Sequence, residues 1–205
     1  MGVPAAAPNV PRPANGRVNL QSMCGIIGYT GARDATPILL EALKTLEYRG
    51  YDSAGVGVIR DGHIGVTKVA GRVEALAQRL GFVVTDQAAT TGIGHTRWAT
   101  HGEVTDRNAH PHTSTDEAVA IVHNGIVENY LELKSELAAR GCEFRSETDS
   151  EVIAHLVDGF MKDGDNLETA LRKSARRIRG AAAIVAVLVS AIEQRKSWRY
   201  DRFYR

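Results

Sequence analysis

The 205-residue sequence is poor in cysteine, with only Cys24 and Cys142. Two cysteines cannot build the disulfide framework that holds small secreted domains together, and free thiols suit a reducing cytosol. The residues before Met23 also lack the continuous apolar segment of a secretory signal. We therefore expect a cytoplasmic protein with reduced thiols.

Long apolar runs and clustered positive charge are missing as well. No stretch approaches the ~18 apolar residues of a membrane-spanning helix. The net charge is +1, but residues 1–22 carry two arginines and no acid, and residues 193–205 carry five basic and two acidic side chains. The remaining residues therefore have a mildly acidic balance, whereas nucleic-acid binding normally needs a clustered basic face. We expect a soluble protein that binds neither membranes nor nucleic acid.

Proline and periodicity divide the chain into three parts. Four of the six prolines lie in residues 1–22, which have no hydrophobic periodicity and are predicted to be a disordered extension, either a miscalled start or a propeptide. Residues 23–192 alternate short β-branched runs with amphipathic segments and are predicted to form one domain. Residues 193–205 show no period and are predicted to be an unmatched tail without a further strand.

Hydrophobic patterns and glycine-rich turns give the expected secondary structure. One predicted helix has Asp34 as its cap, and another stops at Gly141, a usual residue after a helix end. The predicted strands are 26–29, 54–59, 64–68, 93–96, 119–123 and 181–191, and the predicted helices are 35–48, 129–140, one from about 148 to 160, and 167–178.

Cys24 follows Met23 and precedes a predicted strand. An isolated cysteine is most often a small buried apolar residue, and that interpretation stays open from these residues alone. A catalytic thiol needs a base, because a free thiol with a pKa near ~8.5 is mostly protonated at neutral pH. If Met23 is removed, the α-amine of Cys24, with a reference pKa of about 7.7 to 8.0, supplies that base within the same residue.

Histidine is concentrated in one region, with five of the seven between residues 95 and 123, so a metal site is the first alternative there. The only close pair is His110 and His112, with no cysteine or acid at a zinc-like spacing, and we expect no metal. Arg97 in the same region is interpreted as an anion ligand, because a guanidinium binds a carboxylate through two parallel hydrogen bonds.

Asn124-Gly125 and Asp149 each allow a structural and a chemical interpretation. Asn-Gly is the strongest two-residue hairpin signal, but the following residues resemble a helix entry, and an Asn amide beside a Gly N–H can bind an oxyanion. Asp149 lies at a predicted helix start, where acidic side chains commonly cap the helix. The alternative for Asp149 is a ligand ammonium group.

Five segments occur in order: MCGIIG, LEYRGYDSAG, HTRWATHG with NAHPH, HNGIVENY, and SETDSEVIAHL. Together they resemble the class II glutamine amidotransferases, which are N-terminal-nucleophile hydrolases, and within them the glucosamine-6-phosphate synthase family. The resemblance covers about 160 of the 205 residues. It implies an α/β (α+β) fold, a four-layer αββα sandwich of two largely antiparallel sheets with helices outside, here C-terminally truncated.

The resemblance also implies the chemistry, without a cofactor: hydrolysis of L-glutamine to glutamate and ammonia. Cys24 would be the nucleophile, and Asn124 and Gly125 would hold the oxyanion. Arg97 would bind the α-carboxylate of glutamine and Asp149 its α-ammonium. A loop that closes over glutamine would include Trp98, Thr100 and His101. The ammonia acceptor in this family is a sugar-isomerase domain that uses fructose-6-phosphate, and we expect no such domain within these 205 residues.

One departure from the family concerns the nitrogen of Cys24. With residues 1–22 attached that nitrogen is an amide without a basic lone pair, so we expect no turnover until Cys24 becomes N-terminal. Two alternatives remain open: a glutamine-binding module without turnover, and a non-functional gene fragment.

Overall fold

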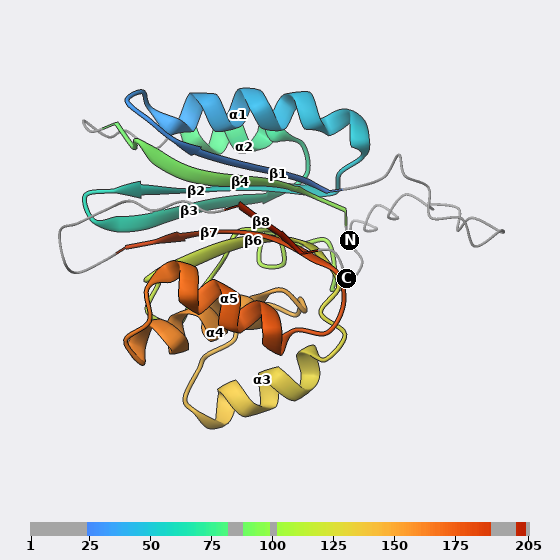
Figure 1. Cartoon of the computed structure of the whole chain (residues 1–205). Helices are drawn as coiled ribbons and strands as arrows, with labels where there is room; N and C mark the ends of the chain where they lie inside the picture. The colour runs from blue at the N-terminus through green and yellow to red at the C-terminus, as the bar shows by residue number, and fades with distance from the viewer. Residues whose placement is uncertain (1–23, 82–87, 99–101, 190–199, 204–205) are drawn as a thin grey trace, which may run out of the picture.

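The computed structural model describes residues 24–81, 88–98, 102–189 and 200–203, which form four layers. Helices α1 and α2 cover one sheet, a second sheet packs beneath it, and α3, α4 and α5 cover the outer face of the second sheet (Figure 1). The strands are β1 (Gly25–Thr30), β2 (Ser53–Arg60), β3 (His63–Ala70), β4 (Thr91–Arg97), β5 (His112–Thr113), β6 (Val119–Gly125), β7 (Ala182–Leu188) and β8 (Tyr200–Phe203). The helices are α1 (Ala35–Leu46), α2 (Val73–Gly81), α3 (Tyr130–Ala139), α4 (Glu151–Lys162) and α5 (Leu167–Arg177), with a 3-10 helix η1 (Glu47–Arg49).

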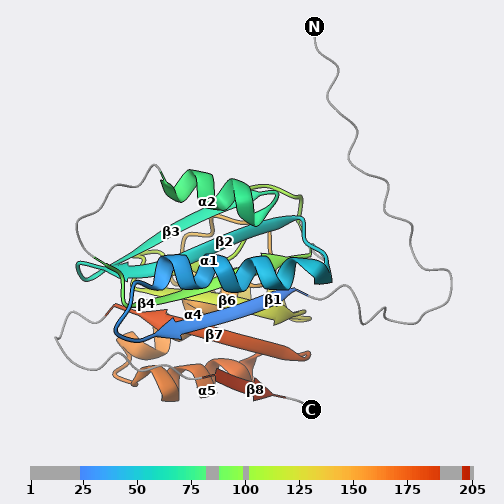
Figure 2. The ribbon, with the colours of Figure 1, turned by 90° about the horizontal axis from the view of Figure 1, so that it is seen from above.

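Both sheets are antiparallel throughout the described residues. The first has the order β1-β4-β2-β3 and the second the order β5-β6-β7-β8. Seen from above, α1 and α2 lie across the first sheet (Figure 2). The predicted αββα sandwich is therefore confirmed, since the sheets face each other and the helices are outside.

Helix α1 shows how local sequence builds one layer. The Asp34 side chain accepts a hydrogen bond from the Thr36 N–H at 3.1 Å, as a helix cap should. Leu39 and Leu43 are fully buried against β4, where a Cβ on Gly92 would lie 2.8 Å from Leu39 Cδ1. Small residues in β4 thus let the helix approach the sheet closely.

Alternation along β4 and β6 decides which side chains lie between the sheets. Ile93 of β4 and Ala120 and Val122 of β6 belong to one buried cluster that also includes residues of β3 and β7. Because side chains in a strand alternate between faces, His95 and Asn124 continue these inward-facing series. The layer between the sheets therefore changes from apolar to polar toward the end of both strands.

The structure extends and corrects the sequence-based elements. Helix α2 and the two-residue β5 were not predicted, and β8 pairs antiparallel with β7, so the expectation that no strand follows β7 is wrong. Asn124-Gly125 ends β6 and leads toward α3, so it does not form a hairpin. In the described part of the chain, no helix combines the length and the apolar content needed to cross a bilayer.

Candidate active site

Cys24 lies directly before β1, beside the end of β4. The Trp98 N–H donates to Cys24 Sγ at 3.0 Å, and the thiol is 3.6 Å from the Trp98 carbonyl oxygen, which it faces as a donor. The next residue, Gly25, donates its N–H to Thr96 Oγ1 at 3.1 Å. A Cβ on Gly25 would lie 2.7 Å from that oxygen, so the residue after the thiol must be small.

The surroundings of Cys24 favour the protonated thiol. Burial raises the pKa of Cys24 above its ordinary value, the Trp98 N–H opposes this, and the Asp52 carboxylate adds to it. A thiolate is the nucleophilic form, so this thiol needs a base that takes its proton as it attacks. The other free cysteine, Cys142, packs against the core beneath the second sheet, apart from these groups.

Asn124 of the second sheet contacts Cys24. Its Nδ2 donates to the Cys24 carbonyl oxygen at 2.9 Å, and its Oδ1 lies 2.8 Å from His95 Nε2. The fold thereby joins residues that are 100 positions apart in sequence.

Gly125 completes this end of β6 with a backbone that favours glycine. Its φ is +135°, and a Cβ there would lie 2.1 Å from the Ala181 carbonyl oxygen. A side chain would meet backbone, which cannot rotate away, so this position requires glycine.

Arg97 ends β4 and is 4% exposed. Its Nη1 lies 3.8 Å from Asp52 Oδ1, and its guanidinium donates to the carbonyl oxygens of Glu103 at 3.3 Å and Gly102 at 3.4 Å. The guanidinium therefore ties the start of β2 to the segment after residue 101. A carboxylate ligand would have to join or replace these partners.

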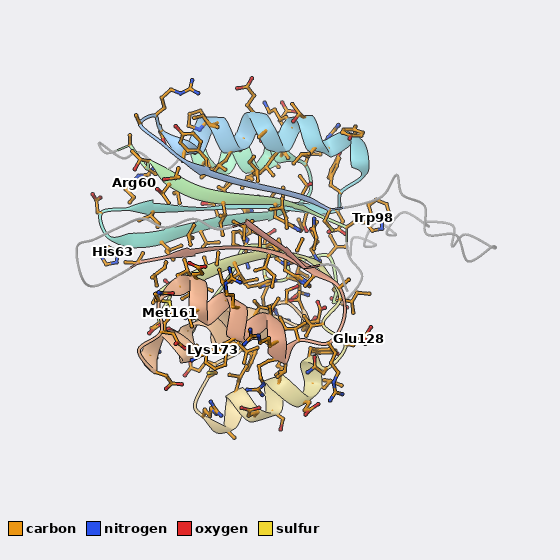
Figure 3. All side chains as sticks on the ribbon, in the orientation of Figure 1. Arg60, His63, Trp98, Glu128, Met161 and Lys173 are labelled. Carbon is orange, nitrogen blue, oxygen red and sulfur yellow. The ribbon has the colours of Figure 1, made fainter. Side chains whose placement is uncertain are left out.

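Trp98 lies at one end of the sandwich, and Arg60 at the end of β2 and His63 at the start of β3 lie at the other end (Figure 3). A Cβ on Gly50 would lie 3.0 Å from the Trp98 ring, so the indole covers the backbone of that glycine. The predicted site residues Thr100 and His101 fall outside the described residues.

Asp149 is buried and serves the backbone. Its Oδ2 accepts from the Val127 N–H at 2.7 Å, and its Oδ1 accepts from the Ser150 hydroxyl at 3.3 Å. The carboxylate thus braces the turn that follows Asn124-Gly125. It caps that turn, and helix α4 begins two residues later, at Glu151.

His95 is the functional candidate that sequence reasoning missed. It is 1% exposed, and its ring reaches Asn124 across the two sheets. A signal for it existed, because His95 is two residues after the inward-facing Ile93 and two before Arg97, which places all three on one face of β4. Its partner could not be found from sequence, since the pairing depends on how the sheets stack.

A hollow of about 330 Å³ lies elsewhere, between the edge strands β3 and β5. Lys68, Arg107, His112 and Glu151 are among its lining residues, and burial lowers the pKa of Lys68 to about 8. The Lys68 ammonium donates to the Arg107 carbonyl oxygen at 3.0 Å. None of the residues around Cys24 lines this hollow, so it is separate from the candidate active site.

Comparisons with known proteins agree on one family. Residues 78–172 match the family described as glutamine amidotransferase domain. The chain is 56% identical over 163 residues to glutamine–fructose-6-phosphate aminotransferase (isomerizing) of Thermus thermophilus. This alignment covers 80% of this chain and 26% of the relative. The enzyme of that name from Pyrococcus horikoshii is 49% identical over 172 residues, covering 84% of this chain and 28% of the relative. The chain thus spans about a quarter of the length of these curated relatives.

Solved structures show the same likeness. The glutamine phosphoribosylpyrophosphate amidotransferase from B. subtilis, complexed with ADP and GMP, superposes with a TM-score of 0.64 at 27% identity, over 80% of this chain and 35% of that one. A structure described as the allosteric regulatory enzyme of purine biosynthesis gives a TM-score of 0.65 at 28% identity, over 78% of this chain and 34% of that one. The likeness therefore extends across the described sandwich.

Proposed function

The chain belongs to the glutamine amidotransferase family, and on that premise we propose that its Cys24 end releases ammonia from L-glutamine. The observation that carries this proposal is the contact between the two sheets: Asn124 Nδ2 donates to the Cys24 carbonyl oxygen at 2.9 Å. That contact holds an amide donor beside the residue that bears the thiol. A nucleophile with a fixed donor next to it is what acyl transfer requires.

The proposed reaction proceeds in two stages. Cys24 Sγ attacks the side-chain carboxamide carbon of glutamine, a C–S bond forms, and the carbonyl π electrons move to oxygen. Asn124 Nδ2–H and Gly125 N–H bind this oxyanion, and loss of one oxyanion donor typically costs an enzyme about 10² to 10³ in kcat. When the C–N bond breaks, ammonia leaves and a thioester remains. Water then hydrolyses the thioester, which releases glutamate and restores the thiol.

The base for both stages is the α-amine of Cys24. Burial keeps the thiol protonated, and an amine at the same residue takes that proton and hands it to the departing nitrogen. An amide nitrogen cannot do this. We therefore propose that turnover requires Cys24 to be the first residue of the chain.

Selection of the free amino acid is assigned to Arg97 and Asp149, for the α-carboxylate and α-ammonium of glutamine. Each is charged and nearly buried, and each now has protein partners, so binding would add to or replace Asp52 and the Val127 N–H. Trp98, Thr100 and His101 are proposed to close over the bound substrate. Closure of that kind excludes water from the thioester until ammonia has left.

The wider activity is proposed from the relatives. Their printed name couples glutamine to fructose-6-phosphate, so we propose that the ammonia released here is meant for a sugar-isomerase partner domain in glucosamine-6-phosphate synthesis. Both cysteines are free thiols, which suits a cytoplasmic setting.

The test compares glutamate release by the full chain with release by a chain that begins at Met23 and has the methionine removed. Activity is expected only in the second, and Cys24→Ala in that chain should abolish it. Activity of the full chain with mass-spectrometric proof of an intact amide at Cys24 would contradict the requirement for a free amine. Absence of activity in both chains would sink the glutaminase proposal.

A glutamine-binding module without turnover is the second candidate, favoured by the amide at Cys24 in the full chain. Because a ligand that binds the folded state raises the melting temperature, the melting temperature with and without glutamine decides it. A rise without glutamate release supports the module. If glutamine does not raise the melting temperature of either chain, the result supports the non-functional fragment.

A further inference from the structure

His95 lies between the sheets and contacts the one side chain that joins them at the site. Its Nε2 is 2.8 Å from Asn124 Oδ1, and Asn124 Nδ2 is 2.9 Å from the Cys24 carbonyl oxygen. The Asn124 carboxamide is thus held at both ends. Its donor end meets the nucleophile's own backbone, and its acceptor end meets His95.

The chemistry of the three groups decides which atom donates. A carbonyl oxygen is an acceptor without a proton, so the Asn124 atom that faces the Cys24 carbonyl must be the amide nitrogen. The oxygen of Asn124 then faces His95, and a hydrogen bond at 2.8 Å requires His95 to donate from Nε2. The reverse amide orientation would set two oxygens against each other.

The surroundings of His95 select the neutral form of this donor. Burial lowers the pKa of His95 to about 4; the hydrogen bond to Asn124 opposes this shift, and the Arg97 guanidinium adds to it. A neutral imidazole with its proton on Nε2 carries none on Nδ1, and His95 Nδ1 has no hydrogen-bond partner within the described residues. The His110 ring, with its centroid 4.2 Å from that of His95, packs against it.

Because both ends of the planar Asn124 carboxamide are hydrogen-bonded, the direction of its second N–H is fixed. One hydrogen of Asn124 Nδ2 goes to the Cys24 carbonyl, and the second is held in the amide plane at about 120° to the first. Without His95, rotation about the Cβ–Cγ bond would let this hydrogen swing away from the reacting carbon. Fixed donors stabilise an oxyanion because they need no reorganisation during the reaction.

We propose that His95 is the positioning residue of the oxyanion-binding group: through its Nε2–H it orients the Asn124 carboxamide toward the oxyanion that forms when Cys24 attacks. This rests on the proposed glutaminase function. In this proposal His95 contacts Asn124 and not the substrate, which is bound by Asn124 and Gly125.

The kinetic test uses the full chain with a protease site inserted before Cys24, cleaved after purification, and three variants. His95→Phe keeps a ring but no donor, and we expect kcat for glutamate release to fall on the order of 10²-fold with KM for glutamine within a few-fold. His95→Gln restores an amide donor and should recover about tenfold of that loss. His110→Phe, the matched control in the adjacent buried ring, should stay within a few-fold of the parent.

Equal losses in His95→Phe and His110→Phe would make the effect one of packing and overturn the proposal. So would an unchanged kcat in His95→Phe, or a loss that lies wholly in KM. Recovery by Gln is the outcome that a merely structural ring cannot produce.

A second measurement is independent of turnover. In the uncleaved full chain, ¹⁵N–¹H NMR of the imidazole nitrogens, assigned to His95 by the signal that His95→Phe removes, should show the Nε2–H tautomer at pH 7. The Nδ1–H tautomer would overturn the proposal even in an active enzyme. If the tautomer is as expected but the parent releases no glutamate, the positioning geometry stands and the proposed function fails.

Discussion

Strands β4 and β6 both end at the candidate active site, but they differ in the residues they place there. β4 has glycines at 92 and 94 facing α1, and ends in the buried charge of Arg97, which is matched by Asp52 and two carbonyl oxygens. β6 has no glycine before its end, and finishes in neutral donors at Asn124 and Gly125. The side chain at the end of β4 is a buried cation that requires hydrogen-bond acceptors and a counter-charge. The donors at the end of β6 are neutral, and one of them requires a positive φ at Gly125.

Each strand also buries one histidine near its end, on opposite sides of the second sheet. His95 of β4 faces the other sheet and contacts Asn124. His123 of β6 faces the helices, and its Nδ1 lies 2.8 Å from Ser150 Oγ. His95 therefore contacts a proposed oxyanion donor, whereas His123 contacts the residue that follows Asp149.

A side chain at Gly125 should disrupt the end of β6 more than any other change considered for these two strands. Gly125→Ala places a Cβ 2.1 Å from the Ala181 carbonyl oxygen at a φ of +135°, so we expect about 3 to 5 kcal/mol of lost stability and at least a ~10²-fold loss of glutamate release. The matched control is Gly141→Ala after α3, where φ is +90° but no atom lies within 4 Å of the new Cβ. It should cost only about 1 to 2 kcal/mol, the strain of an L-residue at positive φ. Urea unfolding of both variants is the measurement, and equal costs would contradict the backbone-clash argument.

A comparison of the two histidines by pH comes next. Burial lowers the pKa of both His95 and His123 from 6.5 to about 4. Between these pH values the two histidines are protonated in the unfolded chain but not in the folded chain. The free energy of unfolding therefore falls as the pH drops from about 6.5 toward 4. Each histidine contributes about 1.4 kcal/mol per pH unit in this window, and the stability is fully present above it.

The variant for this prediction is His123→Gln, measured by urea unfolding from pH 7 to pH 4.5. The slope of unfolding free energy against pH should decrease by about the share of one histidine. His63→Gln, at an exposed position in β3, is the control for replacing a histidine outside the core. A slope that is the same in the parent and in His123→Gln would show that this imidazole takes up its proton in the folded state.

The sequence predicted most of the strands and helices because their signals are local, whereas the four layers were expected from the family resemblance. Runs of β-branched residues gave β2, β3, β4 and β6, and Asp34 gave the start of α1. Helix α2 was missed because its buried stripe consists of Val73 and Leu76 alone. β5 has two residues, too few for a period, and β8 pairs with β7 through the backbone, which no side-chain pattern reports.

The site was less predictable where it depends on the stacking of the sheets. The motifs pointed to Cys24 and Asn124, and the structure brings these two together. The motifs did not show that Asp149 accepts the Val127 N–H or that Arg97 is engaged by Asp52. Contacts of this kind join segments from different layers, so they follow from the packing of the whole sandwich and not from any one segment.

A milder change tests how β4 accommodates α1. Gly94→Ala would place a Cβ 2.9 Å from Ile27 Cγ2 and 3.1 Å from Leu43 Cδ1, so the variant should lose about 1 to 3 kcal/mol by overpacking. Gly65→Ala in β3 of the same sheet meets no atom closer than 3.9 Å, and should change stability by no more than about 0.5 kcal/mol. Urea unfolding of the two variants checks this. If Gly94→Ala were as stable as Gly65→Ala, Ile27 and Leu43 would be able to shift, and close approach of α1 would not be the reason for glycine in β4.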